Sequence, residues 1–143
     1  MGKSISVIQK IAWVYAVMFL VTVLVSHIPS FTDQKGLLFG LYHVSPLIDS
    51  VHFLSGVLAV VVALHSTRWS VTYFKWAGVI FGIDVLLSLL FSRDLLETFS
   101  IFTRGIGSPN FSVTNLLANS PHTLISLFAL WVGFRFSKQI MQK

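Results

Sequence analysis

Two long apolar runs open with nearly the same polar phrase, and this pattern constrains the fold more than any other feature of the chain. Residues 49–52 (Asp-Ser-Val-His) open the first run, and residues 119–122 (Asn-Ser-Pro-His) open the second. Neither 51–64 nor 121–134 contains a charged residue. Together with their flanks, runs of this length and composition predict membrane-spanning helices.

The composition leads to the same interpretation. Of the 143 residues, 55% are hydrophobic and 10% are charged, whereas a soluble domain has about 25% charged residues. A spanning helix needs about 20 residues, so the length allows four of them. We therefore predict an all-α integral membrane protein, a four-transmembrane-helix bundle that forms a single domain over residues 1–143.

The cysteine count and the charge exclude several classes of protein. The chain has no cysteine, which excludes disulfides, thiolate metal sites and covalent c-type haem attachment. The net charge of +5 comes from lysines and arginines at the predicted helix ends, where membrane topology and anionic lipid headgroups account for them. We expect the lipid bilayer, and not nucleic acid, as the partner.

The hydrophobic runs and the basic residues together predict a topology. The four spans are expected at about 8–28, 47–66, 72–92 and 119–138. The first follows Lys3 and Lys10, and since no small-residue cleavage site comes after it, we interpret it as an uncleaved signal anchor. Seven of the ten lysines and arginines lie in the two termini and the second loop. The positive-inside rule therefore places both termini in the cytoplasm.

The two phrases also predict an internal duplication. Aligning the second phrase with the first pairs Asp49 with Asn119 and His52 with His122. Both copies enter the membrane from the same side, as parallel repeats do. The predicted bundle is a pseudo-twofold repeat of two helical hairpins, with halves at about 5–70 and 71–140.

A family resemblance rests on the stretch that leads into the second span. Residues 40–56, with His52 followed by Gly56 four residues later, resemble the hallmark of small bacterial four-helix membrane proteins that are catalogued only as a domain of unknown function. That family has Asn-x-x-His in spans two and four; Asn119 and His122 match it, whereas Asp49 replaces the first asparagine. The resemblance implies this topology in a bacterial inner membrane, and no known activity.

The two histidines have a structural and a functional interpretation. Asp49 and Asn119 are favoured types for helix N-caps, which would place each histidine in a first turn, bonded to the cap or to water. Alternatively, His52 and His122 bind a metal, a haem or a chlorophyll-type pigment through neutral imidazole. Gly56 would then leave room for a flat ring one turn below His52.

Asp84 is the carboxylate expected at mid-depth, because it lies about 8 residues, or roughly 12 Å, from the outer end of the third span. A carboxyl group at the centre of a spanning helix costs about 2.5–3.5 kcal/mol on insertion scales, so its side chain should face the protein interior. We predict a polar cluster of Asp84 with His52, His122 and Ser126. A protonated Asp84 that joins two helices through one hydrogen bond is the structural alternative.

Two glycines predict close helix packing on the third span. Gly78 and Gly82 are four residues apart, the small-xxx-small spacing at which membrane helices approach closely. Ser126 is a further small residue on the fourth span and is expected at the same contact.

The sequence favours a non-enzymatic protein, because it has no phosphate-binding glycine loop, nucleophile elbow or Glu-x-x-His pair. The leading hypothesis is a small structural or accessory membrane protein, a subunit that packs on a larger membrane complex. The second is a haem- or pigment-binding module for electron transfer or light harvesting that uses His52 and His122. The third is a small-molecule or ion carrier centred on Asp84.

Overall fold

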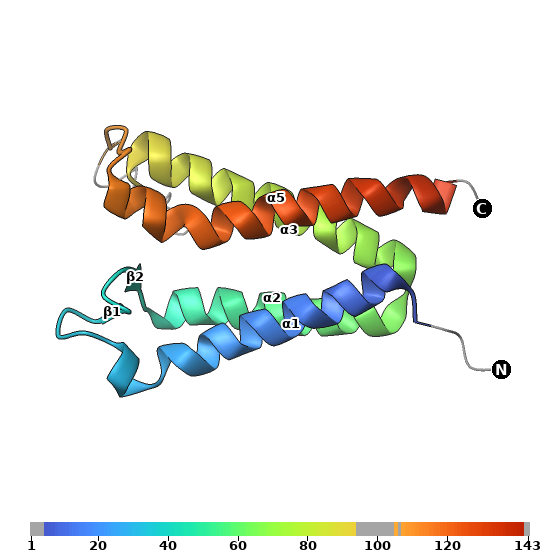
Figure 1. Cartoon of the computed structure of the whole chain (residues 1–143), viewed down its shortest axis with the longest axis horizontal. Coiled ribbons are helices and arrows are strands. Elements are labelled where there is room, and N and C mark those ends of the chain that lie inside the picture. The colour runs from blue at the N-terminus through green and yellow to red at the C-terminus, as the bar shows by residue number, and fades with distance from the viewer. Residues whose placement is uncertain (1–4, 94–104, 106, 142–143) are drawn as a thin grey trace. The chain divides into compact units, whose positions relative to one another are not determined.

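The computed structural model describes residues 5–93, 105 and 107–141 (Figure 1). The prediction of four spans is confirmed, since four helices of the described chain are long and apolar enough to cross a membrane. The chain is therefore an integral membrane protein. In chain order the elements are α1 (Val7–Ser26), the 3-10 turn η1 (Pro29–Phe31), β1 (Leu37–Leu38), β2 (Tyr42–His43), α2 (Pro46–His65), α3 (Thr67–Phe91) and α5 (Val113–Met141).

The N-caps of α2 and α5 are serines that the hydropathy pattern does not reveal. The Ser45 side chain accepts a hydrogen bond from the backbone N–H of Ile48 at 3.2 Å, and Pro46 fills the first helical position, for which its fixed φ is suited. At the start of α5, Ser112 Oγ accepts from the backbone N–H of Asn115 at 3.3 Å. The prediction that Asp49 and Asn119 cap these helices was wrong, because both lie inside them.

The third and fourth helices also begin earlier than predicted. Ser66 is the single residue between α2 and α3, and its Oγ accepts from the backbone N–H of Trp69 at 3.3 Å. This cap starts α3 at Thr67, five residues before the apolar pattern begins. In α5 the helix likewise includes a polar segment ahead of the apolar run.

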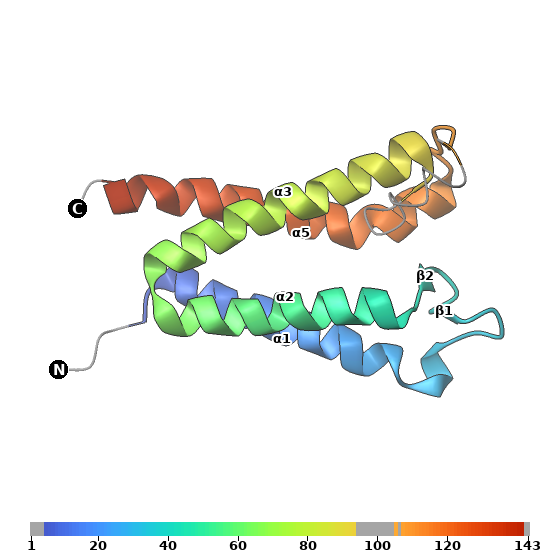
Figure 2. The ribbon, with the colours of Figure 1, turned by 180° about the vertical axis from the view of Figure 1, so that it is seen from behind.

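The structure divides into two compact units, Met1–Tyr73 with Gly133–Lys143 and Phe74–Val132. In the first unit, α1 and α2 lie side by side and antiparallel (Figures 1 and 2). Gly56 lets them approach closely, since a Cβ atom on it would lie 3.0 Å from Leu20 Cγ. At the other end of the pair, Gln9 Nε2 donates to the backbone carbonyl of Ala63 at 2.7 Å.

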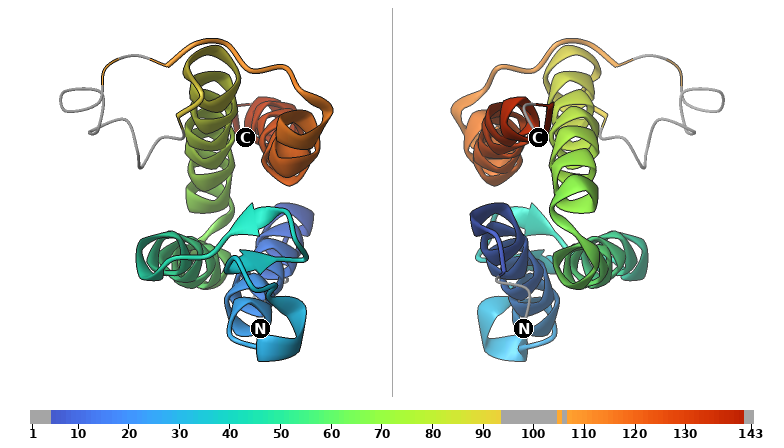
Figure 3. Two further views of the ribbon diagram at one scale, coloured as in Figure 1. Left: turned by 90° about the vertical axis from the view of Figure 1, so that its left-hand side faces the viewer. Right: turned by 90° about the vertical axis from the view of Figure 1, so that its right-hand side faces the viewer.

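In the second unit, α3 and α5 lie side by side (Figure 3). Their closest approach is at Gly78, where a Cβ atom would come within 2.6 Å of Leu130 Cγ and 2.8 Å of the Leu130 backbone nitrogen. A Cβ atom on Gly82 would lie 2.9 Å from Ser126 Oγ. The three residues predicted as packing positions, Gly78, Gly82 and Ser126, thus meet at one helix contact.

A short hairpin leads into α2. β1 pairs antiparallel with β2, and Phe39 and Gly40 in the turn between them have positive φ. These two short strands were not among the elements predicted from the sequence, which were all helical. In the predicted outer connection 93–118, residues 94–104 and 106 lie outside the described residues.

Candidate functional site

The second unit brings together two ionisable side chains that the sequence analysis singled out. His122 Nδ1 on α5 lies 2.8 Å from Asp84 Oδ2 on α3. Asp84 comes seven residues before the end of α3 at Phe91, which corresponds to about 10 Å along the helix. The Asp84 side chain is 13% exposed and the His122 side chain is 30% exposed. The carboxyl group and the imidazole are therefore bonded to each other between two candidate membrane spans.

Phe81 contacts the imidazole of this pair. The centroids of its ring and the His122 ring are 5.3 Å apart, with the planes tilted by 48°. Phe81 lies one turn before Asp84 on the same helix and is buried. The aromatic ring covers that side of the imidazole, and a hydrogen bond is stronger where water is excluded and the local dielectric constant is low.

A ladder of amide and hydroxyl groups extends from the pair toward the loop that precedes α5. Asn119 Nδ2 donates to Ser88 Oγ and to the Asn115 carbonyl, both at 2.9 Å. Asn115 Nδ2 in turn donates to the carbonyl of Asn110 at 2.8 Å. Asn119 is buried. Polar groups thus follow one another from the loop before α5 to within one helical turn of His122.

Ser88 and Asn115 were not among the site residues predicted from the sequence. The available signal was the spacing of Asn115, Asn119, His122 and Ser126, which recur at intervals of four, three and four residues and so share one face of a helix. Asn119 was interpreted as a cap, which placed the start of the helix too late for this face to be recognised.

Pro121 lies inside α5 immediately before His122. Because proline has no backbone N–H, the carbonyl of Leu117 loses its helical partner. The Ser120 hydroxyl donates to that carbonyl at 2.7 Å. This substitute bond keeps the backbone satisfied where the helix carries His122, as spanning helices require.

On the other side of the pair from the ladder, the polar groups end at a tightly packed contact. Ser126 Oγ donates to the backbone carbonyl of Gly78 at 2.7 Å, and Ser126 is buried. Gly78 and Leu130 pack directly beyond it. The polar groups from Asn110 to Ser126 form the polar seam of the second unit, and close packing of Gly78 against Leu130 follows its Ser126 end.

The first unit contains the other predicted site residues. The ring of His52 stacks on Phe19, with centroids 5.9 Å apart and planes inclined by 27°. The space beside Gly56 is occupied by Leu20 and Phe19 of α1. Asp49 Oδ1 accepts a hydrogen bond from Ser26 Oγ at 2.8 Å. In the described part of the chain, no three His, Cys, Asp or Glu side chains are grouped closely enough to hold a metal ion.

The two helix pairs make two corresponding contacts. Each histidine packs on a phenylalanine of the preceding helix, Phe19 for His52 and Phe81 for His122. Each Asp or Asn at the start of the polar phrase bonds a serine of the preceding helix, which is Ser26 in the first pair and Ser88 in the second. The two phenylalanines have the same separation in sequence as the two serines.

The family model for a domain of unknown function, DUF4383, matches residues 9–105. The chain belongs to this family. The matched segment contains His52 and Asp84, whereas Asn119 and His122 come after it. No curated protein and no solved structure matches the chain. The Asn-x-x-His motif stays a prediction from the resemblance.

Proposed function

We propose that this member of the DUF4383 family is a small membrane carrier that takes up and releases a proton at the Asp84–His122 pair. The observation that carries the proposal is the 2.8 Å contact between Asp84 Oδ2 and His122 Nδ1 inside a candidate span. Ionisable side chains at membrane depth are costly, and they commonly mark proton relays and ion pathways. Histidine is also the side chain whose charge changes between pH 5 and 8 in its unperturbed state.

The charge of the pair explains why proton release would be coupled to another ion. With one shared proton, a carboxylate and an imidazole have no net charge, which hydrocarbon tolerates. Loss of that proton leaves a net negative charge at Asp84, whose desolvation is expensive. Release of the proton therefore requires another positive charge to neutralise Asp84. A small monovalent cation that takes the place of the proton supplies this charge.

The polar seam supports access from one side. The ladder of Asn115, Asn119 and Ser88 offers successive donors and acceptors between the loop and the pair. At the other end of the seam, α3 and α5 are in close contact at Gly78 and Leu130. In the predicted orientation, with both termini in the cytoplasm, the Asn110 end of the seam faces outward, so the pair would exchange its proton with the outer solution.

We further propose that the two helix pairs are duplicated hairpins of a pseudo-twofold four-helix bundle, as the repeated phrase predicts. The paired contacts of Phe19 with His52 and of Phe81 with His122 support this. At the separation that relates the two phenylalanines, the counterpart of Asp84 is Thr22. The first hairpin thus keeps the histidine without the carboxylate, and proton binding would be confined to the second.

Proteoliposomes that contain a pH-sensitive dye test the carrier proposal. A sodium or potassium gradient should drive a pH change in vesicles with the native chain, and Asp84→Asn should abolish it. Asp33→Asn is the matched control, since Asp33 lies in an exposed loop and its Oδ1 bonds the backbone N–H of Lys35. Equal rates in Asp84→Asn and native vesicles, or no cation-driven pH change with either gradient, would contradict the proposal.

Nuclear magnetic resonance of the ¹⁵N-labelled histidines provides a second, independent readout. Asp84→Asn removes the carboxylate bonded to Nδ1, so the His122 ring signals should change while the His52 signal stays unchanged. A His122 signal that does not respond to proton exchange or to Asp84→Asn would leave only a structural role for the bond.

The other two hypotheses stay predictions with their own tests. Comigration with a larger assembly on a native gel is expected of an accessory subunit. An absorption band in the visible spectrum of the purified protein, lost in His52→Ala and His122→Ala, is expected of a haem or chlorophyll-type pigment module.

A further inference from the structure

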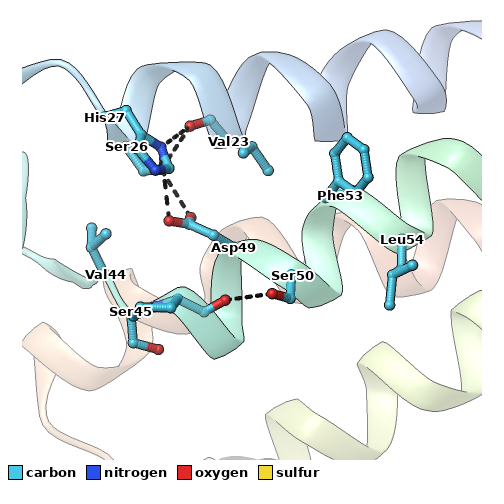
Figure 4. Close-up of a pocket in the computed structure, with 10 residues that line it drawn as sticks. Val23, Ser26, His27, Val44, Ser45, Asp49, Ser50, Phe53 and Leu54 are labelled. Carbon is cyan, nitrogen blue, oxygen red and sulfur yellow. Dashed lines mark hydrogen bonds and ion pairs between the residues drawn. The ribbon is translucent and has the colours of Figure 1, made fainter.

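The first unit contains a pocket at the end where α1 leaves the membrane span and α2 enters it (Figure 4). Its volume is about 600 Å³, within the range of about 300–1,000 Å³ that is usual for small-molecule sites. The lining comes from the end of α1, the segment between β2 and α2, and the first turns of α2. It includes Ser26, His27, Ser45, Asp49, Phe53 and Leu54.

Asp49 carries the negative charge of this pocket, and its side chain is 14% exposed. Among the described residues, its contacts are the Ser26 hydroxyl at 2.8 Å and His27 Nδ1 at 3.9 Å. The His27 nitrogen lies 2.8 Å from the carbonyl of Val23, and since a carbonyl only accepts, the Nδ1 hydrogen points there. The Asp49 carboxylate, which has about four acceptor positions, therefore retains capacity for a cationic donor.

The wall that follows Asp49 along α2 is apolar. Phe53 and Leu54 line the pocket, and within the described chain they are 50% and 63% exposed. Exposed apolar side chains of a spanning helix are suited to contact with acyl chains. Asp49 is the fourth residue of α2 and so lies about 5 Å from the start of that helix. The pocket thus joins an anionic wall near the headgroup level to a wall that continues into the hydrocarbon.

We propose that this pocket binds a phospholipid whose headgroup ends in an ammonium group, with the ammonium on Asp49 and the acyl chains along Phe53 and Leu54. The partial positive charge at the N-terminus of α2, where Ser45 and Pro46 lie, suits the adjoining phosphate. A headgroup with a phosphate and no ammonium would meet the uncompensated Asp49 charge. The site is separate from the Asp84–His122 pair and does not depend on its role.

Native mass spectrometry of the delipidated full chain tests the proposal. The protein should retain phosphatidylethanolamine about tenfold better than phosphatidylglycerol with the same acyl chains, the order expected for one charge-assisted hydrogen bond. Free ethanolamine should compete only weakly, because it lacks the apolar part. Competition by ethanolamine at lipid-like concentrations would overturn the lipid assignment in favour of a soluble amine.

Two variants separate ligand binding from the contact between α1 and α2. Asp49→Asn keeps an oxygen that accepts from Ser26 but removes the charge, so the preference for phosphatidylethanolamine should disappear. Ser26→Ala removes the interhelical bond but keeps the charge, so the preference should remain. Asp33→Asn is a control for loss of one negative charge. Retention of the preference in Asp49→Asn, or equal binding of both lipids by the native chain, would refute the proposal.

Discussion

Replacing Gly78 with alanine would place a methyl group where α3 and α5 already touch. The added Cβ atom would lie 2.6 Å from Leu130 Cγ and 2.8 Å from the Leu130 backbone nitrogen, whereas carbon atoms in favourable contact are about 3.5–4.0 Å apart. The side chain can rotate away, but the backbone atom cannot. The two helices must therefore separate by about 1 Å.

The cost follows from three contributions. Overpacking of a tight contact costs about 1–3 kcal/mol. Separation by this amount also breaks the 2.7 Å bond from Ser126 Oγ to the Gly78 carbonyl, and such bonds contribute about 0.6 kcal/mol within a membrane. Alanine regains about 1 kcal/mol through its higher helix propensity. We expect a net loss of about 1–2 kcal/mol in the free energy of unfolding.

Reversible unfolding in mixed micelles, followed by circular dichroism, measures this loss. Two further glycines serve as matched controls, since each gains the same helix propensity. Gly82→Ala meets Ser126 Oγ at 2.9 Å and Gly56→Ala meets Leu20 Cγ at 3.0 Å, and both neighbours are side-chain atoms. The two controls should cost less than Gly78→Ala. If Gly78→Ala were as stable as Gly56→Ala, the close backbone approach would not exist in the protein.

Three other predictions concern polar contacts, each of which lies within a single unit. In a double-mutant cycle, Asp84→Asn and His122→Ala should show a coupling of about 1–2 kcal/mol in unfolding experiments, because their bond is charge-assisted. Ser120→Ala should cost about 1 kcal/mol in the free energy of unfolding, because it leaves the Leu117 carbonyl without a donor. Adding Pro121→Ala should restore the stability, because the backbone N–H of alanine can bond that carbonyl. Gln9→Leu should cost about 1–2 kcal/mol in the same assay, because it removes both the bond to the Ala63 carbonyl and the capping bonds with Ser6.

The existence of the four spans could be predicted because hydrocarbon imposes one simple requirement on composition. The helix starts could not, because Ser45 and Ser112 act through local hydrogen bonds that leave no mark in a hydropathy pattern. Thr67 begins α3 in a polar turn for the same reason. Hydropathy locates the part of a helix that lies in lipid, whereas capping decides where its backbone begins.

The bond between Asp84 and His122 was also within reach of the sequence, because a carboxyl group at membrane depth needs a polar partner. The ladder around Asn115 and Ser88 was not recognised. It depends on the register between α3 and α5, and the contact of Gly78 with Leu130 fixes that register. A pattern on one helix cannot specify which residues of the next helix face it.

Depth in the membrane gives the two carboxylates of the corresponding hairpins different chemistry. Asp49 lies in the first turn of α2, where the partial positive charge of the helix N-terminus favours a negative side chain. Asp84 lies about 10 Å from the end of α3, where a lone negative charge is costly. Under the two proposals above, the first would bind a cationic headgroup, whereas the second would share a proton with His122 or exchange it for another cation. The two proposed sites differ because the depth of a carboxylate along its helix changes which partner can neutralise it.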